Sequence, residues 1–412
     1  MGERMNAPAR PMIRCKRVTK VFGPAAAGSG PAVDEALAMA HDGVGRAEIQ
    51  QRTDATLAVY DVSFDVLPGE LFVVMGLSGS GKSTLVRLLN RLIEPSSGVI
   101  EVDGRELGSL DDTELRELRN RRMSMVFQHF ALLPHRTVRQ NAEYGLKIRG
   151  VPDEERREKG EWALEQVGLA DRAEAHPGQL SGGMQQRVGL ARALASDTDV
   201  LLMDEPYSAL DPLIRRDMQA LLARLQSELR KTIVFITHDL NEAMLLGDRI
   251  MLLKDGRPVQ VGTGPEILAA PADDYVADFV SDVDRTRVLT AADVMREARV
   301  VVRPDERPAD VLRRLGESEA TGAYVLDDDR RILGVVRDDW LARAAATGTD
   351  SISRAGLDGD YLTTEPDRPL IDLVDQVGRN VVPLAVVDEG SRLLGVVPRA
   401  AVLASLAAPG RS

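Results

Sequence analysis

The sequence has little of several features that mark other classes of protein. Its 412 residues contain one cysteine, Cys15, so no disulfide can form within the chain and a reduced thiol is expected. No apolar run approaches the ~18–20 residues that cross a bilayer, and residues 1–20 carry charges throughout, unlike a signal peptide. A basic surplus is also missing, because the formal net charge is -12 and the pI is about 5.1. Nucleic acid is therefore not expected as a partner, and any membrane role must come through another subunit.

Short apolar runs alternate with helical patterns as far as about residue 265. This alternation is typical of an α/β domain with a largely parallel sheet. The clearest buried strands are Leu71–Met75, Val200–Met203 and Ile233–Ile236, and Asp255 and Gly256 form the turn of a hairpin that follows them. Each of the three strands runs directly into residues that suit phosphate chemistry, at the carboxyl ends where such sheets bind ligands.

A glycine-rich segment after the first of these strands has the pattern of a P-loop. Residues 76–84 read GLSGSGKST and lead into a predicted helix, Leu85–Ile93. In this pattern the glycines turn backbone N–H groups toward the phosphates, Lys82 adds a mobile positive charge, and the Ser83 hydroxyl ligates Mg²⁺. The predicted nucleotide contacts here are Gly76, Ser78, Gly79, Ser80, Gly81, Lys82, Ser83 and Thr84. A strand before the pattern and a helix after it supply the context that a bare match lacks.

Polar residues also follow three other apolar strands. Asp204 suits the outer shell of Mg²⁺, and Glu205 suits a general base that activates the attacking water. His238 is placed to contact the γ-phosphate and to position Glu205, although an isolated histidine there would more often make an ordinary hydrogen bond. Gln128 is an amide at the point where a strand gives way to a loop. The alternative, that Asp204 and Glu205 are solvated acids which merely end a strand, is a poor explanation when a P-loop is present in the same sequence.

The segment Leu180–Arg187 reads LSGGMQQR and precedes a long helix to Ala195. It resembles the signature sequence of ABC ATPases, with Ser208–Asp211 as the D-loop, Gln128 as the Q-loop and His238 as the switch histidine. The resemblance implies that two subunits sandwich two ATP molecules head to tail, with the P-loop of one chain facing the signature of the other.

In that arrangement the backbone of the signature presents N–H groups to a γ-phosphate held by the partner chain. The residues that the resemblance adds to the nucleotide contacts are Ser181, Gly182, Gly183 and Asp211. It also makes Glu205, His238 and Gln128 the catalytic set, and adds Gln128 to Ser83 and Asp204 at the metal. ATP and Mg²⁺ are the cofactors implied.

Many ABC ATPases stack adenine on an aromatic residue near the first strand. An insertion separates the two candidates, Phe22 and Tyr60, and we favour Phe22 because Lys20–Gly23 resembles the family's adenine loop. Packing of the Phe22 ring in the core is the alternative.

The sequence resembles most closely the ATP-binding subunits of glycine betaine and proline betaine importers. The stretches that carry this resemblance are 76–84 with RLLNRLIEP at 87–95, FQ at 127–128 with LPH at 133–135, and SALDPLIR at 208–215. It implies a homodimeric ATPase on the cytoplasmic face of the inner membrane, which drives a separate transmembrane permease and, through it, works with an extracytoplasmic substrate-binding protein. The solute would be a quaternary-ammonium osmoprotectant. The alternatives are an importer of another small solute, such as choline, carnitine or an amino acid, and a soluble ABC ATPase without a permease, although those usually carry two cassettes in one chain.

The last part of the chain contains an internal repeat. Val325 and Val386 begin similar Val-Leu-Asp and Val-Val-Asp segments, Gly334 and Gly395 begin identical Gly-Val-Val segments, and the offset is 61 residues in both cases. The pair resembles CBS modules. The chain is thus predicted to hold an α/β ABC-type ATPase domain at 1–265, with a helical insertion at about 24–57 and a helical subdomain at about 129–195, then a linker at 266–287 and α+β CBS modules at 288–346 and 347–412.

CBS modules that bind adenine nucleotides usually place a Ser or Thr, and then an Asp, after the Gly-Val-Val strand. Arg337 and Trp340 occupy these places in the first module, and Pro398 and Ala401 occupy them in the second, so AMP or ATP sensing is not expected. The repeated strands are instead surrounded by arginines: Arg330, Arg331, Arg337, Arg392 and Arg399. An anionic lipid or a cyclic dinucleotide would suit such a patch, and the alternative is that these arginines only keep an aspartate-rich surface soluble.

Overall fold

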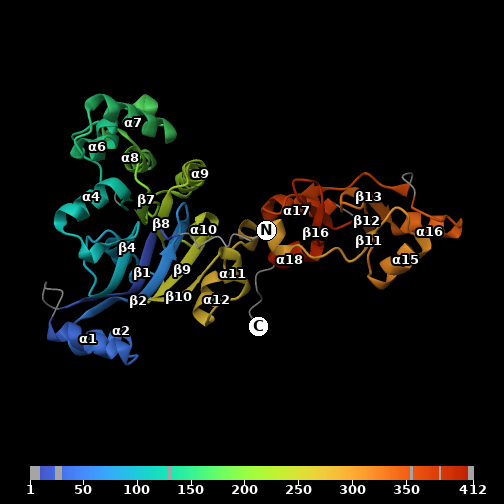
Figure 1. The fold of residues 1–412 in the computed structure, drawn as a ribbon, viewed down its shortest axis with the longest axis horizontal. Helices are drawn as coiled ribbons and strands as arrows, with labels where there is room; N and C mark the ends of the chain where they lie inside the picture. The colour runs from blue at the N-terminus through green and yellow to red at the C-terminus, as the bar shows by residue number, and fades with distance from the viewer. Residues whose placement is uncertain (1–9, 24–29, 129–130, 353–355, 380–381, 407–412) are drawn as a thin grey trace, which may run out of the picture. The chain divides into compact units, whose positions relative to one another are not determined.

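The structure, a computed structural model, describes residues 10–23, 30–128, 131–352, 356–379 and 382–406. Parts of the predicted insertion (24–29), helical subdomain (129–130) and second CBS module (353–355, 380–381, 407–412) lie outside these ranges, as do residues 1–9. The chain forms two compact units, residues 1–277 and 278–412 (Figure 1).

A six-stranded sheet with the order β10-β9-β3-β8-β7-β6 forms the centre of unit 1. Its strands are β3 (Leu71–Met75), β6 (Met123–Val126), β7 (Val200–Asp204), β8 (Thr232–Thr237), β9 (Arg249–Lys254) and β10 (Arg257–Gly262). Every residue of β3, β7 and β8 is buried, which is typical of parallel strands covered on both faces. All neighbours pair in parallel except β9 and β10, which form the predicted hairpin. The predicted α/β fold with a mostly parallel sheet is confirmed.

The register of this sheet brings four strand ends to one edge. Met75 at the end of β3 pairs with Thr237 at the end of β8, and Asp204 at the end of β7 pairs with Ile236. Because β3, β8, β7 and β6 are consecutive neighbours, the segments that leave their carboxyl ends lie side by side.

A second, antiparallel sheet has the order β2-β1-β4-β5. Its strands are β1 (Ile13–Phe22), β2 (Thr56–Val66), β4 (Ser97–Val102) and β5 (Arg105–Glu106). The two sheets share one core with helix α3 (Lys82–Leu89), and the stacked rings of Phe64 and Phe72, with centroids 5.0 Å apart, join them. The helix predicted at Leu85–Ile93 begins earlier, directly from the P-loop, and ends at Leu89 because Arg91 adopts a left-handed φ of 52°.

The insertion between β1 and β2 contains two helices, α1 (Pro31–His41) and α2 (Arg46–Thr53). They form a small core of their own with the ends of the adjoining strands, in which Ile49 is fully buried beside Val21 and Leu57. This core anchors the two helices of the insertion to the antiparallel sheet.

The remaining helices of unit 1 connect the strands. They are α4 (Asp112–Arg122), α5 (Val138–Ala142), α6 (Tyr144–Ile148), α7 (Asp153–Gln166), α8 (Gly182–Ala195), α9 (Pro212–Leu229), α10 (Leu240–Leu246), α11 (Gly264–Ala269) and α12 (Asp274–Val280), the last of which ends in unit 2. Figure 1 shows α6, α7 and α8 gathered at the end of unit 1 that lies away from α1 and α2. Among the described residues, no helix is both long and apolar enough to span a membrane.

Unit 2 contains two three-stranded sheets of the same design. The first combines β11 (Val301–Val302), β12 (Gly322–Leu326) and β13 (Ile332–Arg337) with α15 (Pro308–Glu317) and α16 (Asp338–Ala346). The second combines β14 (Thr363–Thr364), β15 (Leu384–Val387) and β16 (Leu393–Val397) with α17 (Leu370–Arg379) and α18 (Arg399–Leu406). Even the break in register recurs, where Leu326 pairs with Ile332 in one sheet and Val387 pairs with Leu393 in the other.

The two modules share apolar contacts, and a segment from the start of the first module packs with the second. Tyr324, Val335, Leu393 and Val396 lie in one cluster that joins them. Two short helices, α13 (Arg285–Val288) and α14 (Ala291–Val294), precede the strands of the first module in sequence, yet Ala291 is buried in the core of the second module. The start of the range predicted as the first module therefore packs with the second module.

Candidate active site

The P-loop connects β3 to α3 and is held closely at both ends. Gly76 and Gly81 have φ values of 153° and 103°, and a Cβ atom on them would lie 2.1 Å from the Leu253 carbonyl oxygen and 2.3 Å from the Ala58 carbonyl oxygen. Only glycine allows backbone from β9 and β2 to approach so closely. Ser78 and Gly79 are exposed between these ends, whereas Ser80 is buried and Thr84 is half-buried on α3.

Lys82 lies inside the loop. Its ammonium donates to the carbonyl oxygens of Gly76 and Leu77 at 2.8 and 3.1 Å, and lies 3.7 Å from Oε1 of Glu205. Burial lowers the pKa of Lys82, and the nearby Glu205 carboxylate opposes that shift. The structure thus joins the cation of the P-loop to the carboxylate at the end of β7.

The predicted metal ligands Ser83 and Asp204 are in direct contact. The Ser83 hydroxyl donates to Oδ1 of Asp204 at 2.9 Å, although 121 residues separate the two in sequence. Burial raises the pKa of the Asp204 carboxyl, and the hydrogen bond from Ser83 lowers it. A hydroxyl and a carboxylate beside a phosphate-binding loop are the hard oxygen ligands that Mg²⁺ requires, so these residues fit that ion.

Glu205 and His238 form the next pair along the same edge. Glu205 adopts a left-handed φ of 44°, its N–H donates to the Ile236 carbonyl at 3.0 Å, and its side chain is 18% exposed. Nδ1 of His238 lies 3.1 Å from Oε2 of Glu205. A strained, well-held backbone of this kind is found at functional sites, where surrounding contacts fix one orientation of a side chain.

Gln128 reaches this edge through a different link. Its Nε2 donates to the Ser208 hydroxyl at 3.1 Å, and that hydroxyl donates to the Glu205 carbonyl oxygen at 3.1 Å. The structure thus connects Gln128 to the D-loop and the backbone of Glu205, and connects Ser83 to Asp204 separately. The predicted site residues do not include Ser208, although its position as the first residue of the D-loop indicates a place at this edge.

The signature residues differ in exposure. The Ser181 hydroxyl caps helix α8 by accepting from the Met184 N–H at 3.4 Å, and Ser181 and Gly182 are both exposed. Gly183 is buried, and a Cβ atom there would lie 2.3 Å from Cγ2 of Ile214. Its lack of a side chain is therefore explained by packing within its own chain.

Asp211 also has a structural role. Its carboxylate caps α9 by accepting from the N–H groups of Leu213 and Ile214, both at 3.1 Å. The structure accounts for this residue without a nucleotide contact.

The two candidate adenine-stacking rings lie in different surroundings. Phe22 is 39% exposed, and the Lys20 ammonium lies 5.1 Å from its centroid. Tyr60 packs against the core of the insertion, with the Arg257 guanidinium 4.1 Å from its ring centroid. The Phe22 ring is the more accessible of the two.

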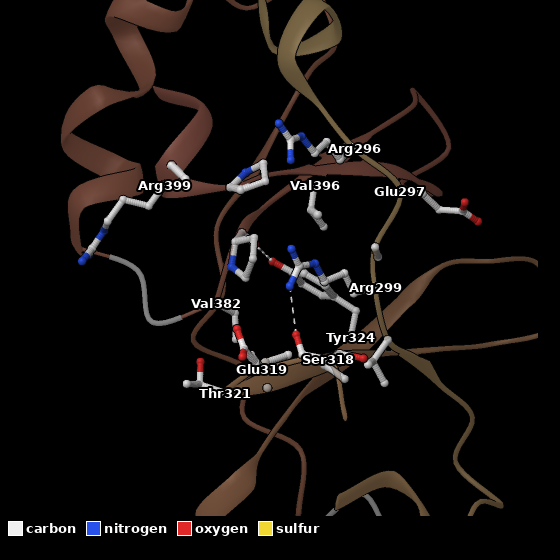
Figure 2. A pocket seen from close by; sticks show the side chains of 18 of the residues that line it. Arg296, Glu297, Arg299, Ser318, Glu319, Thr321, Tyr324, Val382, Val396 and Arg399 are labelled. Atoms are coloured by element: carbon white, nitrogen blue, oxygen red, sulfur yellow. Dashed lines mark hydrogen bonds between the residues drawn. The ribbon is translucent and has the colours of Figure 1, made fainter. Parts of the chain in front are cut away.

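A cleft of about 680 Å³ lies between the two modules of unit 2. Figure 2 shows Arg296 and Arg399 at one end and Glu319 and Thr321 at the other, with apolar side chains such as Val382 between them. Its walls are fixed by hydrogen bonds from Arg299 to the Ser318 carbonyl at 2.9 Å and from Tyr324 to the Pro383 carbonyl at 2.7 Å. Sequence reasoning missed Arg296 and Arg299, which lie before the first repeated strand.

The five arginines of the predicted patch do not act as one group. Arg337 pairs with Asp358 at 3.0 Å, Arg330 donates to the Leu393 carbonyl at 3.2 Å, and Arg399 donates to the Gly378 carbonyl. The other two, Arg331 and Arg392, are exposed and face each other across an antiparallel bridge between the modules.

Comparison with known proteins places this geometry in a family. The sequence profile of the ABC transporter family matches residues 59–208, and that of the CBS domain matches residues 291–343. The glycine betaine/carnitine transport ATP-binding protein GbuA of Listeria monocytogenes is 47% identical over 96% of this chain and 97% of its own length. The glycine betaine transport ATP-binding protein OpuAA of Bacillus subtilis is 45% identical over 98% of this chain and 94% of its own.

A solved structure extends the likeness to the fold of unit 1. The dimeric structure of a post-hydrolysis state of the ATP-binding cassette MJ0796, bound to ADP and Pi, matches with a TM-score of 0.51 and 34% identity. It covers 61% of this chain and 98% of that one. The chain therefore belongs to the family of ATP-binding, ATP-hydrolysing subunits of ABC transporters, and it carries a C-terminal CBS domain.

Proposed function

We propose that two copies of this chain hydrolyse ATP, with Mg²⁺, to import a quaternary-ammonium osmoprotectant of the glycine betaine type. The chains would act on the cytoplasmic face of the inner membrane, through a separate permease that receives solute from a substrate-binding protein. The observation that carries this proposal is the 47% identity to GbuA, which extends over 96% of the chain and so includes both units. Relatives named for trimethylamine N-oxide and choline transport match a smaller share of the chain, 79% and 84%.

The substrate is tested by uptake in a host without betaine uptake of its own, carrying this gene with those of its permease and binding protein. We expect uptake of labelled glycine betaine that disappears when Lys82→Ala replaces the wild-type chain, because the P-loop cation holds the phosphates. Unlabelled proline betaine, carnitine, choline, trimethylamine N-oxide and amino acids serve as competitors. Competition by amino acids alone would contradict the proposed substrate class.

The chemistry would be divided among the residues at the edge of the parallel sheet. The P-loop backbone and Lys82 would bind the phosphates, and Ser83, Asp204 and Gln128 would hold Mg²⁺. When bound, Mg²⁺ would offset negative charge that develops on the transferred phosphoryl group. Glu205 would accept a proton from the attacking water, and the His238 ring, 3.1 Å from Oε2 of Glu205, would hold that carboxylate in place.

The role of Glu205 predicts a specific effect of Glu205→Gln. The amide keeps the shape of the carboxylate but cannot accept the proton, so turnover should fall by ~10²–10⁴ while ATP still binds. ATPase activity of the reconstituted transporter and ATP affinity are the two measurements. Glu228→Gln, at an exposed carboxylate on α9, is the control. Hydrolysis near the wild-type rate in Glu205→Gln would show that another group is the base.

The signature sequence would complete the site of a second chain. Ser181 and Gly182 are exposed at the start of α8, where the first N–H groups of the helix have no partner within it. Such a helix end attracts an anion. In the proposed pair, the anion is the γ-phosphate held by the P-loop of the partner chain.

This arrangement predicts different effects of Ser181→Asp and Ser181→Asn. Both residues are good helix caps, so both variants should fold. Only aspartate adds a negative charge, and unit charges ~4 Å apart at an effective dielectric constant of about 20 repel by about 4 kcal/mol. ATPase activity should therefore fall by ~10²-fold or more in Ser181→Asp and far less in Ser181→Asn. Equal activities of the two variants would contradict a γ-phosphate at this position.

Unit 2 would regulate transport through its exposed arginine pair. Arg331 and Arg392 are exposed and pair across a backbone bridge, which puts both side chains on one face. Each arginine near an anionic membrane surface contributes about 1 kcal/mol of attraction. This attraction decays within a Debye length, ~8 Å at physiological salt. Contact with anionic lipid would hold the transporter inactive at low ionic strength, and higher salt would release it. A cyclic dinucleotide in the cleft between the modules is the competing account, since Arg296 and Arg399 could contact its phosphates.

The lipid account predicts that replacing both Arg331 and Arg392 with glutamine lowers the salt concentration at which transport begins. Transport is measured against salt in vesicles with varied anionic lipid. The matched control replaces Arg313 and Arg343, which are exposed but paired with Glu317 and Asp339. An unchanged threshold, together with loss of transport on adding a cyclic dinucleotide, would favour the competing account.

A further inference from the structure

One side chain of the insertion reaches the P-loop. Nη1 of Arg46, the first residue of α2, donates to the Gly79 carbonyl oxygen at 2.6 Å. Arg46 lies outside all the motifs that define the ATP site, in a segment inserted between β1 and β2. Among the described residues it forms no ion pair, so its guanidinium is directed to the loop by the backbone carbonyl alone.

The insertion presents Arg46 from a fixed position. Helices α1 and α2 are held by the buried cluster around Ile49, and Nη2 of Arg257 on β10 donates to the Ala40 carbonyl at 3.1 Å. Arg257 also stacks on Tyr60 of β2, which packs against the same cluster. The α1–α2 insertion is thus attached to both sheets. Arg46 therefore lies on a segment whose position does not depend on the P-loop.

The hydrogen bond falls on the least restrained part of the loop. Gly79 is exposed, has a φ of 79°, and has no atom within 4 Å of the position that a Cβ would take. A peptide group next to such a glycine can rotate between orientations at little steric cost. Here the peptide between Gly79 and Ser80 is held at both ends, because its carbonyl accepts from Arg46 and its N–H donates to the Leu77 carbonyl at 3.1 Å.

The orientation of this peptide determines which backbone N–H groups of the loop point toward a bound nucleotide. A P-loop binds phosphates through successive backbone N–H groups that point inward, and rotation of one peptide changes the direction of the neighbouring groups. A loop that is already correctly oriented loses less conformational freedom when the phosphates bind.

We propose that Arg46 is a positioning residue for nucleotide binding, and that the α1–α2 insertion acts as an external support which keeps the P-loop in its phosphate-receiving conformation. Arg46 acts through the Gly79 carbonyl and does not take part in the chemical step. The inference rests on the proposed nucleotide site. It predicts that Arg46 affects ATP and ADP alike, because the loop cradles phosphates that both nucleotides possess.

The test compares Arg46→Gln, Arg46→Lys and Arg52→Gln in the full-length chain. Arg52 lies on the same helix and, among the described residues, forms only an exposed pair with Glu48 at 3.4 Å, so it is the matched control. Affinities for ATP and ADP are measured with the purified chain, and KM and kcat are measured in the reconstituted transporter. Arg46→Gln should weaken both nucleotides and raise KM about tenfold, the scale of one charge-assisted hydrogen bond, with little change in kcat. Arg46→Lys should recover most of the affinity, and Arg52→Gln should match the wild type.

Three results would overturn the proposal. Unchanged affinities in Arg46→Gln would show that the loop needs no support from the insertion. A loss confined to ATP would show that the guanidinium contacts the γ-phosphate directly. A lower melting temperature with parallel losses in Arg46→Gln and Arg46→Lys would show a merely structural role. Lys82→Ala is measured alongside, because full nucleotide affinity in that variant would refute the site itself and not only the role of Arg46.

Discussion

The parallel pairing of β3, β8, β7 and β6 is the constraint on which the rest of the site depends. It places the P-loop, His238, the Asp204–Glu205 pair and Gln128 at one edge, although these residues come from distant parts of the sequence. Every residue of the three central strands is buried, so the register cannot slip without exposing apolar side chains. The hydrogen bonds from Ser83 to Asp204 and between His238 and Glu205 follow from this register.

Contacts from three other segments then restrain the P-loop. The Leu253 carbonyl of β9 approaches Gly76, the Ala58 carbonyl of β2 approaches Gly81, and Arg46 of the insertion binds the Gly79 carbonyl. The two glycines at the ends admit close backbone contact, whereas the central glycine is contacted at its carbonyl oxygen by a side chain from another segment. The conformation of the P-loop therefore depends on its own glycines and on contacts from three separate segments of unit 1.

Sequence reasoning was most successful where function depends on consecutive residues. The strand Leu71–Met75 and the repeat around Gly334 and Gly395 were predicted correctly, because burial patterns and internal repeats are local signals. It could not identify contacts between distant segments. The ion pair of Arg337 with Asp358 and the packing of Gly183 on Ile214 depend on tertiary structure, and they explain residues for which the sequence had suggested ligand contacts.

The central claim is that each ATP site is formed by the P-loop of one chain and the signature of another. Chemical cross-linking tests it directly, because the natural thiol, Cys15, is buried and burial raises its pKa, so it will react little. Chains with Ser78→Cys are mixed with chains with Ser181→Cys and oxidised mildly. We predict a disulfide-linked dimer that forms in the mixture and requires ATP. A dimer that forms equally without nucleotide, or no dimer in the mixture, would contradict the composite site.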